Sequence, residues 1–452
     1  MVCYNNNLVT LDVSANPNLI FLNCKNNKIT SLDVSDNPGL QTIYCQNNEL
    51  TSLDVSNNLE LRYLCCGSND IGELDLTNNT KLDTLECYQC NLETLDISPC
   101  IYLTVLNCKE NKLTSINLEA NSKLKTLNIY NSNISSLDVS KNPELESLIC
   151  YGTKITNLDV SNNLKLRTLW CYENKLTELD ASKQVNLKSL TVSWNKLTSL
   201  NVSNCTKLEY LSCFQNALTS LDISDCTNLN FLNCEYNKFT ELDLSNNLLL
   251  TKIDCCKNCL TALDLSKQTC LEETELSGQS ISLPLYKDKD TYYIQLAKGA
   301  DTTKISELSK GSAAELGRIE FTEALEVGDV ITYNYECLDD KMDVTVQISE
   351  IVDVTKPEEV TTEDTTEDSE DTTEDKSDKN ETTEGTTVTE ETTSAITESA
   401  TSEKESTTSE TKKQESVKTG DTTNFVILLM LIVISGTAVV LGKKKNFNEN
   451  EH

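Results

Sequence analysis

The chain has 452 residues, a formal net charge of −33, twenty cysteines and one histidine, His452. This acidity excludes a nucleic-acid partner, which requires clustered Lys and Arg. A single histidine leaves no His-based metal site and no Ser–His or Cys–His catalytic pair. No other nucleophile–base pair or carboxylate pair stands out, so we expect neither an enzymatic activity nor a cofactor.

Residues 1–285 repeat every 21 residues, a period that indicates a solenoid. Cysteine recurs at one position of the repeat, where the only replacements are Ile129, Val192 and Leu276. The members of this cysteine ladder are Cys3, Cys24, Cys45, Cys66, Cys87, Cys108, Cys150, Cys171, Cys213, Cys234 and Cys255. A position that accepts Cys, Ile, Val or Leu selects a compact apolar side chain. We therefore predict that the ladder thiols are buried, unreactive and poorly placed for disulfides.

Other positions of the repeat predict a strand followed by a turn. Alternation places Leu22 and Cys24 inward and Asn23 and Lys25 outward, as in a half-buried strand, and stacking of these strands produces a parallel sheet. Three residues after the cysteine there is usually an asparagine, such as Asn48. It is expected to turn inward and to bond backbone groups of the adjacent coil. The residues that replace this asparagine are Cys90, Ser132, Thr153 and Gln279.

The unit L-x-C-x-x-N-x-L-T-x-L-D-V-S-x-N-x-x-L-x-x resembles the leucine-rich repeat in its strand-and-turn half. The resemblance implies a solenoid of about fourteen repeats, a right-handed β/α or β/3₁₀ superhelix with the parallel sheet on its concave face. The second half of the unit, as in "LTSLDVSNN", is too short for a full helix and favours an extended or 3₁₀ convex side.

Acidic and cysteine positions raise the possibility of metal binding. An aspartate ladder consists of Asp12, Asp33, Asp54, Asp75, Asp96, Asp138, Asp159, Asp180, Asp222, Asp243 and Asp264. Turn capping with the neighbouring Ser is favoured over calcium binding, because Asn117 and Asn201 replace Asp and the repeat lacks a Gly-rich pattern. Cys255, Cys256, Cys259 and Cys270 could hold zinc, but they form no closed four-ligand motif. Cys205 and Cys226 occupy equivalent turn positions, where they can replace Asn.

Beyond the repeats the composition changes twice. Residues 286–354 alternate in short β-type runs and predict a small β domain that covers the last coil. Residues 355–415 consist mainly of Thr, Glu, Ser and Asp, which predicts a disordered stalk. At the other end, Met1 lies two residues before a ladder cysteine without a preceding signal peptide, so we expect the intact chain to be longer and to carry a secretion signal.

Residues 416–452 contain Thr419 and Gly420, an apolar run at 425–441 and a lysine tail. This order resembles a sortase cell-wall sorting signal of Gram-positive bacteria, although Ser416 and Val417 depart from the usual L-P-x-T-G motif. The resemblance implies that a sortase cleaves between Thr419 and Gly420 and links Thr419 to peptidoglycan. The alternative is a membrane helix over 425–441 that is retained. Either arrangement displays the protein outside the cell, with membrane contact only through this segment.

Repeats, stalk and sorting signal together resemble the internalin-like surface proteins. The resemblance implies an adhesin or receptor-binding protein that recognises a host or neighbouring-cell protein or glycan. The alternative is a structural wall or coat protein with no specific ligand.

Outward positions on the expected sheet carry aromatic side chains on neighbouring coils. The candidate binding residues are Tyr88, Tyr130, Ile149, Tyr151, Trp170, Tyr172, Trp194 and Phe214, with Lys109 among them. Strand propensity alone favours Tyr. An exposed aromatic cluster, however, is typical of a contact with a protein or a sugar, so we predict a binding patch centred on Tyr151, Trp170 and Tyr172.

Overall fold

The computed structural model describes residues 1–355. The predicted stalk beyond Thr355, the sorting residues Thr419 and Gly420, and the apolar run 425–441 lie outside the described residues. Within residues 1–355, no helix has the length and apolar character needed to cross a membrane.

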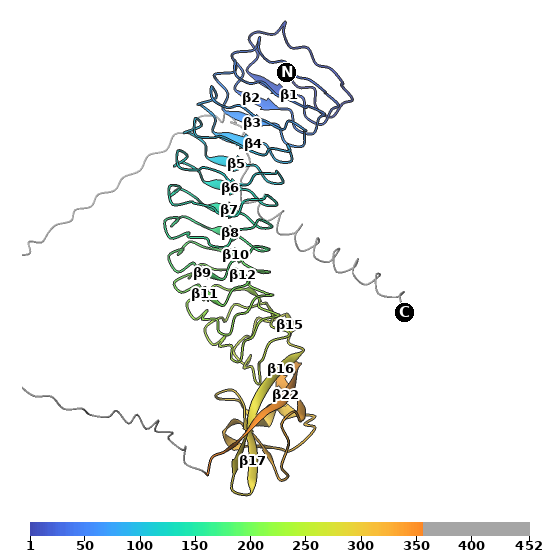
Figure 1. Cartoon of the computed structure of the whole chain (residues 1–452), viewed down its shortest axis with the longest axis vertical. Coiled ribbons are helices and arrows are strands. Elements are labelled where there is room, and N and C mark those ends of the chain that lie inside the picture. The colour runs from blue at the N-terminus through green and yellow to red at the C-terminus, as the bar shows by residue number, and fades with distance from the viewer. Residues whose placement is uncertain (356–452) are drawn as a thin grey trace, which may run out of the picture. The chain divides into compact units, whose positions relative to one another are not determined.

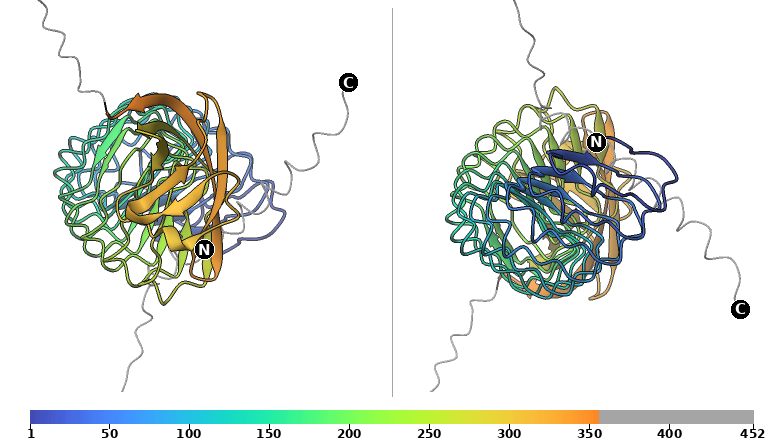
Figure 2. Two further views of the ribbon diagram at one scale, coloured as in Figure 1. Left: turned by 90° about the horizontal axis from the view of Figure 1, so that it is seen from below. Right: turned by 90° about the horizontal axis from the view of Figure 1, so that it is seen from above.

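Thirteen three-residue strands form one parallel sheet along the repeats (Figure 1). They are β1 (Phe21–Asn23), β2 (Thr42–Tyr44), β3 (Tyr63–Cys65), β4 (Thr84–Glu86), β5 (Val105–Asn107), β6 (Thr126–Asn128), β7 (Ser147–Ile149), β8 (Thr168–Trp170), β10 (Ser189–Thr191), β12 (Tyr210–Ser212), β13 (Phe231–Asn233), β14 (Lys252–Asp254) and β15 (Glu273–Glu275). Each strand pairs in register with the strand one repeat away, as Leu148 does with Leu169. Seen from either end, the coils lie over one another (Figure 2). The predicted leucine-rich-repeat solenoid is confirmed.

The return half of each coil contains no helix within residues 1–278. It consists of turns and extended segments, and in two coils these become β9 (Glu178–Asp180) and β11 (Ser199–Asn201), which pair in parallel. Of the two conformations expected for this side, the extended one is therefore present. The segment between the turns has too few residues to form helical hydrogen bonds.

The ladder position lies immediately after each strand and points into the core. Cys171 and its replacements Ile129 and Val192 are fully buried, as is every ladder cysteine from Cys24 onward. All twenty cysteines are free. Burial raises the pKa of the Cys171 thiol well above its usual value and that of Cys108 to about 12, so the reactive thiolate form is suppressed. The predicted core role of the ladder is confirmed.

The asparagine after the ladder cysteine joins adjacent coils as expected. Nδ2 of Asn48 donates to the carbonyl oxygens of Cys45 and Cys24, at 2.9 and 3.1 Å, and its Oδ1 accepts from the amide of Ile29. A second buried row, not expected from the sequence, includes Asn58, whose Nδ2 donates to two carbonyls of the preceding coil. These bonds satisfy backbone groups that the turns would otherwise leave buried and unpaired.

Residues after the last ladder position form a seven-stranded sheet in the order β18-β21-β22-β16-β17-β20-β19. Its strands are β16 (Gln279–Asp288), β17 (Thr291–Gln295), β18 (Ile305–Ser306), β19 (Ser312–Ala314), β20 (Arg318–Phe321), β21 (Val330–Cys337) and β22 (Asp340–Asp353), with 3₁₀ turns η1 (Thr302–Lys304) and η2 (Glu315–Gly317). Strands β21 and β22 pair as an antiparallel hairpin, and β22, the longest strand of the sheet, pairs in parallel with β16.

This β sheet contacts the last coil of the solenoid directly. The hydroxyl of Tyr333 donates to the carbonyl of Thr261 at 2.8 Å, and Sγ of Cys337 lies 3.4 Å from the carbonyl of Leu263. Gln279 begins β16 and also occupies the asparagine position of the repeat. Its side-chain Nε2 donates hydrogen bonds to the carbonyl oxygens of Cys255 and Leu276. The chain therefore passes from coil to β sheet without a linker, and the apolar end of the solenoid is covered.

Candidate binding surface

One row of side chains stands out on the sheet face. The residue after the ladder position points outward, and on five consecutive coils it is Tyr88, Lys109, Tyr130, Tyr151 and Tyr172, which we name the tyrosine row. All five side chains are half-buried against their neighbours. The row unites Tyr88, Tyr130, Tyr151 and Tyr172 of the predicted patch.

The tyrosine rings stack on one another along the solenoid. The ring centroids of Tyr130 and Tyr151 are 4.3 Å apart, those of Tyr151 and Tyr172 are 4.1 Å apart, and each pair is 11° from parallel. Both faces of the Tyr151 ring are therefore covered by its neighbours. What this part of the row offers to a partner is ring edges and hydroxyl groups.

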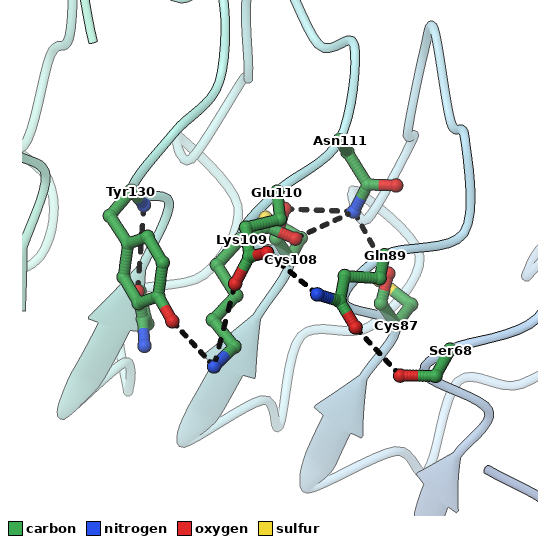
Figure 3. A network of polar contacts seen from close by, with 9 residues as sticks. Ser68, Cys87, Gln89, Cys108, Lys109, Glu110, Asn111 and Tyr130 are labelled. Atoms are coloured by element: carbon green, nitrogen blue, oxygen red, sulfur yellow. Dashed lines mark hydrogen bonds and ion pairs between the residues drawn. The ribbon is translucent and has the colours of Figure 1, made fainter. Parts of the chain in front are cut away.

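Lys109 continues the stack between Tyr88 and Tyr130. Its Nζ lies 5.3 Å from the centroid of Tyr88 and 4.8 Å from that of Tyr130, and donates to the Tyr130 hydroxyl at 2.6 Å (Figure 3). Beside it, Gln89 links the Ser68 hydroxyl to the carboxylate of Glu110 through bonds of 2.8 and 2.6 Å. Glu110 in turn forms an ion pair of 3.9 Å with Nζ of Lys109, so this polar network helps to hold the cation within the row.

Burial also keeps the hydroxyls of the row protonated. Loss of hydration raises the pKa of Tyr88, Tyr130, Tyr151 and Tyr172, with neighbouring carboxylates and phenols contributing. The hydroxyls can therefore donate as well as accept hydrogen bonds at neutral and mildly alkaline pH.

Trp170, placed at the centre of the predicted patch, is not exposed. Its side chain is only 8% accessible, and its Nε1 donates to the hydroxyl of Ser189 on the next strand at 3.0 Å. The expectation of an exposed Trp170 is wrong, because the small outward residues of the next coil, Ser189, Thr191 and Ser193, leave room for the indole to lie down against the sheet. Ile149, its partner across the strand pair, is half-buried.

Trp194 and Phe214 lie apart from the tyrosine row. Their rings meet edge to face with centroids 6.0 Å apart, and Trp194 is 44% exposed. Ser193 occupies the row position between Tyr172 and Phe214 and is buried. The small serine interrupts the stack, so the predicted patch divides into two surfaces.

A further aromatic cluster near the start of the sheet was missed. Phe21, Tyr44 and Tyr63 form a chain of ring contacts with centroid separations of 5.8 and 4.7 Å, and the Tyr63 hydroxyl donates to the carboxylate of Glu86. These rings come from two different outward positions of the repeat. Comparing both positions over adjacent coils would have revealed them.

The aspartate ladder caps turns, as the sequence favoured. In every coil that has the aspartate, its Oδ1 accepts from the backbone amide two residues later, at 2.8–3.0 Å. Asn117 and Asn201 make the same bond. The bonds from serine, or from Thr77 in the case of Asp75, lower the pKa of these carboxyls, for example that of Asp138. Nowhere in residues 1–355 are three or more His, Cys, Asp or Glu side chains grouped as ligands for a metal ion.

Coils of 21 residues, a parallel sheet on one face and an asparagine ladder at its edge define a leucine-rich-repeat protein. No family model and no curated protein sequence matches the chain. Among solved structures, the functional domain of InlJ from Listeria monocytogenes, which includes a cysteine ladder, is 30% identical, with 77% of this chain and 85% of that one covered and a TM-score of 0.63. The chain belongs to the internalin-like family of bacterial leucine-rich-repeat proteins.

Two other structures share the fold. The leucine-rich-repeat protein LIC12759 of Leptospira interrogans is 25% identical over 59% of this chain and 76% of its own, with a TM-score of 0.55. The internalin inlF of Listeria monocytogenes is 22% identical over 62% and 86%, with a TM-score of 0.56.

Proposed function

We propose that this protein is a cell-surface adhesin or receptor-binding protein that contacts a protein or glycan through the tyrosine row. The observation that carries the proposal is the uninterrupted Tyr–Lys–Tyr–Tyr–Tyr stack on five consecutive coils. The same position holds Gln46 and Gly67 before the row and Ser193 after it, so the fold does not require aromatic residues there. Rings already held by stacking lose little conformational freedom on binding, and tyrosine is enriched among interface residues that dominate affinity.

Membership of the internalin-like family supports a binding role for the solenoid. Display on the cell wall rests on the sorting-signal resemblance of residues 416–452, with Thr419 as the residue joined to peptidoglycan and sortase as the enzyme that joins it.

The binding role is tested with the full chain against glycan arrays and against surface-protein preparations from host and neighbouring bacterial cells. Replacing Tyr151 and Tyr172 together by Ser should cost about 2–4 kcal/mol of binding free energy for the ligand identified. Tyr102→Ser is the matched control, because Tyr102 is exposed on a return turn away from the sheet. A double variant that binds like the wild type would refute the tyrosine row. If the protein is found on the cell wall but binds none of the glycans or proteins tested, the alternative of a structural wall or coat protein is favoured.

Anchoring is tested by releasing the mature protein with a muralytic enzyme and analysing it by mass spectrometry. The expected carboxyl end is Thr419 joined to a wall peptide. An intact tail through His452 in the membrane fraction would show that the segment 425–441 is retained instead.

A further inference from the structure

The turn that follows each ladder residue requires a left-handed backbone. Two residues after the ladder position, φ is positive in every coil; this position holds Asn or Gly in six coils and Ser, Gln, Glu or Lys in six others. Trp194 and Tyr236 also occupy it, with φ of 55° and 52°. Bulky side chains are disfavoured in this conformation, and strained residues of this kind concentrate at functional sites. Each is 44% exposed, so the strain is not offset by full burial.

Three more aromatic side chains lie on the same sheet face, two on the coil between Trp194 and Tyr236 and one on the coil of Tyr236. Tyr210 and Phe231 stack with centroids 4.3 Å apart and planes 5° from parallel, and Phe214 meets Trp194 edge to face. We name Trp194, Tyr210, Phe214, Phe231 and Tyr236 the C-terminal patch. It spans the coil that contains Ser193, where the tyrosine row ends, and the two coils after it.

The charge of the sheet face changes beside the C-terminal patch. Three carboxylates, Glu235, Asp254 and Glu275, follow on consecutive coils in the two outward positions that flank the ladder. In the preceding coils from Asn23 to Phe214, those positions hold one carboxylate, Glu86, which bonds the Tyr63 hydroxyl.

Within the part of the chain that the structure describes, these three carboxylates are not neutralised by close ion pairs. No ion pair within residues 1–355 involves Glu235, Asp254 or Glu275. Partial burial, with repulsion between the carboxylates, raises the pKa of Glu235 and of Asp254, and the nearby Lys257 and Lys252 offset this only in part. A cation placed among these groups would relieve that repulsion.

We propose that the C-terminal patch and its three carboxylates bind an arginine-bearing segment of a polypeptide. A guanidinium stacks on aromatic rings and pairs with carboxylates through two parallel hydrogen bonds, so it matches both parts of this surface. The sheet face already accommodates cations in this way, since Lys109 lies between two tyrosine rings and Nζ of Lys257 lies 4.2 Å from the Tyr236 centroid. The inference rests on the proposed function in one respect, that the sheet face is the binding face.

The test measures binding of oligoarginine, oligolysine and oligoglutamate peptides of equal length to the full chain, by calorimetry and by tryptophan fluorescence. Oligoarginine should bind most tightly and should perturb the emission of Trp194. The variant E235Q/D254N/E275Q should bind it roughly tenfold more weakly. The control E49Q/E73Q/E93Q removes three exposed carboxylates away from the sheet face and should change the affinity less than about twofold, as surface charges far from the site do.

Two further variants separate this surface from the tyrosine row. Trp194→Ala should weaken oligoarginine binding, whereas Tyr151→Ser with Tyr172→Ser should leave it unchanged. Equal losses in the two triple variants, unaltered affinity in E235Q/D254N/E275Q, or oligolysine binding as tight as oligoarginine would each overturn the proposal. If the Tyr151→Ser, Tyr172→Ser variant still binds the macromolecular partner, only the proposed role of the tyrosine row is refuted. The proposal for the C-terminal patch would stand, because peptide binding is measured without that partner.

Discussion

Gly67 lies directly beneath the ring of Tyr88, and a Cβ atom at residue 67 would come within 2.6 Å of the ring. That separation is far inside van der Waals contact, so Gly67→Ala must displace the first ring of the tyrosine row. We expect weaker partner binding with little change in the melting midpoint, because the ring can swing outward. Gly39→Ala is the control, since its Cβ would meet only the Leu19 carbonyl oxygen, at 3.7 Å. If both variants bind the partner as tightly as the wild type, Tyr88 is not part of the binding site.

Trp170 is expected to act mainly on stability. Because its indole is buried and bonded to Ser189, Trp170→Ala should destabilise the solenoid by about 3 kcal/mol, within the usual range for large-to-small replacements. Trp194→Ala, at an exposed position, should leave the melting midpoint nearly unchanged. Thermal unfolding followed by circular dichroism measures both. Similar midpoints for the two variants would contradict the buried placement of Trp170.

The cysteine ladder should tolerate an apolar replacement and resist a polar one. Cys171→Val should cost less than about 1.5 kcal/mol, since Val192 occupies the same position fully buried. Cys171→Ser places a hydroxyl among apolar side chains and should cost roughly 1–3 kcal/mol unless it finds a partner. Urea unfolding of the two variants gives the comparison. A serine variant as stable as the valine variant would show that the ladder is not selected for packing.

The aspartate turns predict a loss of stability in acid. Their serine bonds hold the folded pKa below the unfolded value, so the stabilisation is complete above the unfolded pKa and disappears as the pH falls through the folded one. The melting midpoint should therefore fall as the pH drops below about 4, where aspartate begins to titrate. Glu235 and Asp254, with raised pKa values, act in the opposite direction but number only two.

A single substitution isolates this effect. Asp138→Asn keeps the acceptor for Ser140, as Asn117 does for Glu119, but removes the titrating group. Its midpoint at neutral pH should match the wild type, and its dependence on acid should be slightly weaker. A large loss at neutral pH would mean that the charge itself, rather than the turn bond, stabilises the coil.

The repeat alone determined the solenoid, the buried ladder, the inward asparagine and the capping aspartate. Each coil contacts only its neighbours and makes the same bonds to them, so a position that recurs every 21 residues must meet the same environment every time. Cys171, Asn48 and Asp138 could be placed in this way without any knowledge of the tertiary structure.

Only the tertiary structure decided which outward side chains remain accessible. The exposure of a side chain on the sheet depends on the volumes of side chains on adjacent coils, which vary from repeat to repeat and are not periodic. Ser189 gave Trp170 room to lie flat, Ser193 ended the tyrosine stack, and the left-handed turn held Trp194 outward. The period could assign these residues to the sheet face, but contacts between coils determined which of them a partner can reach.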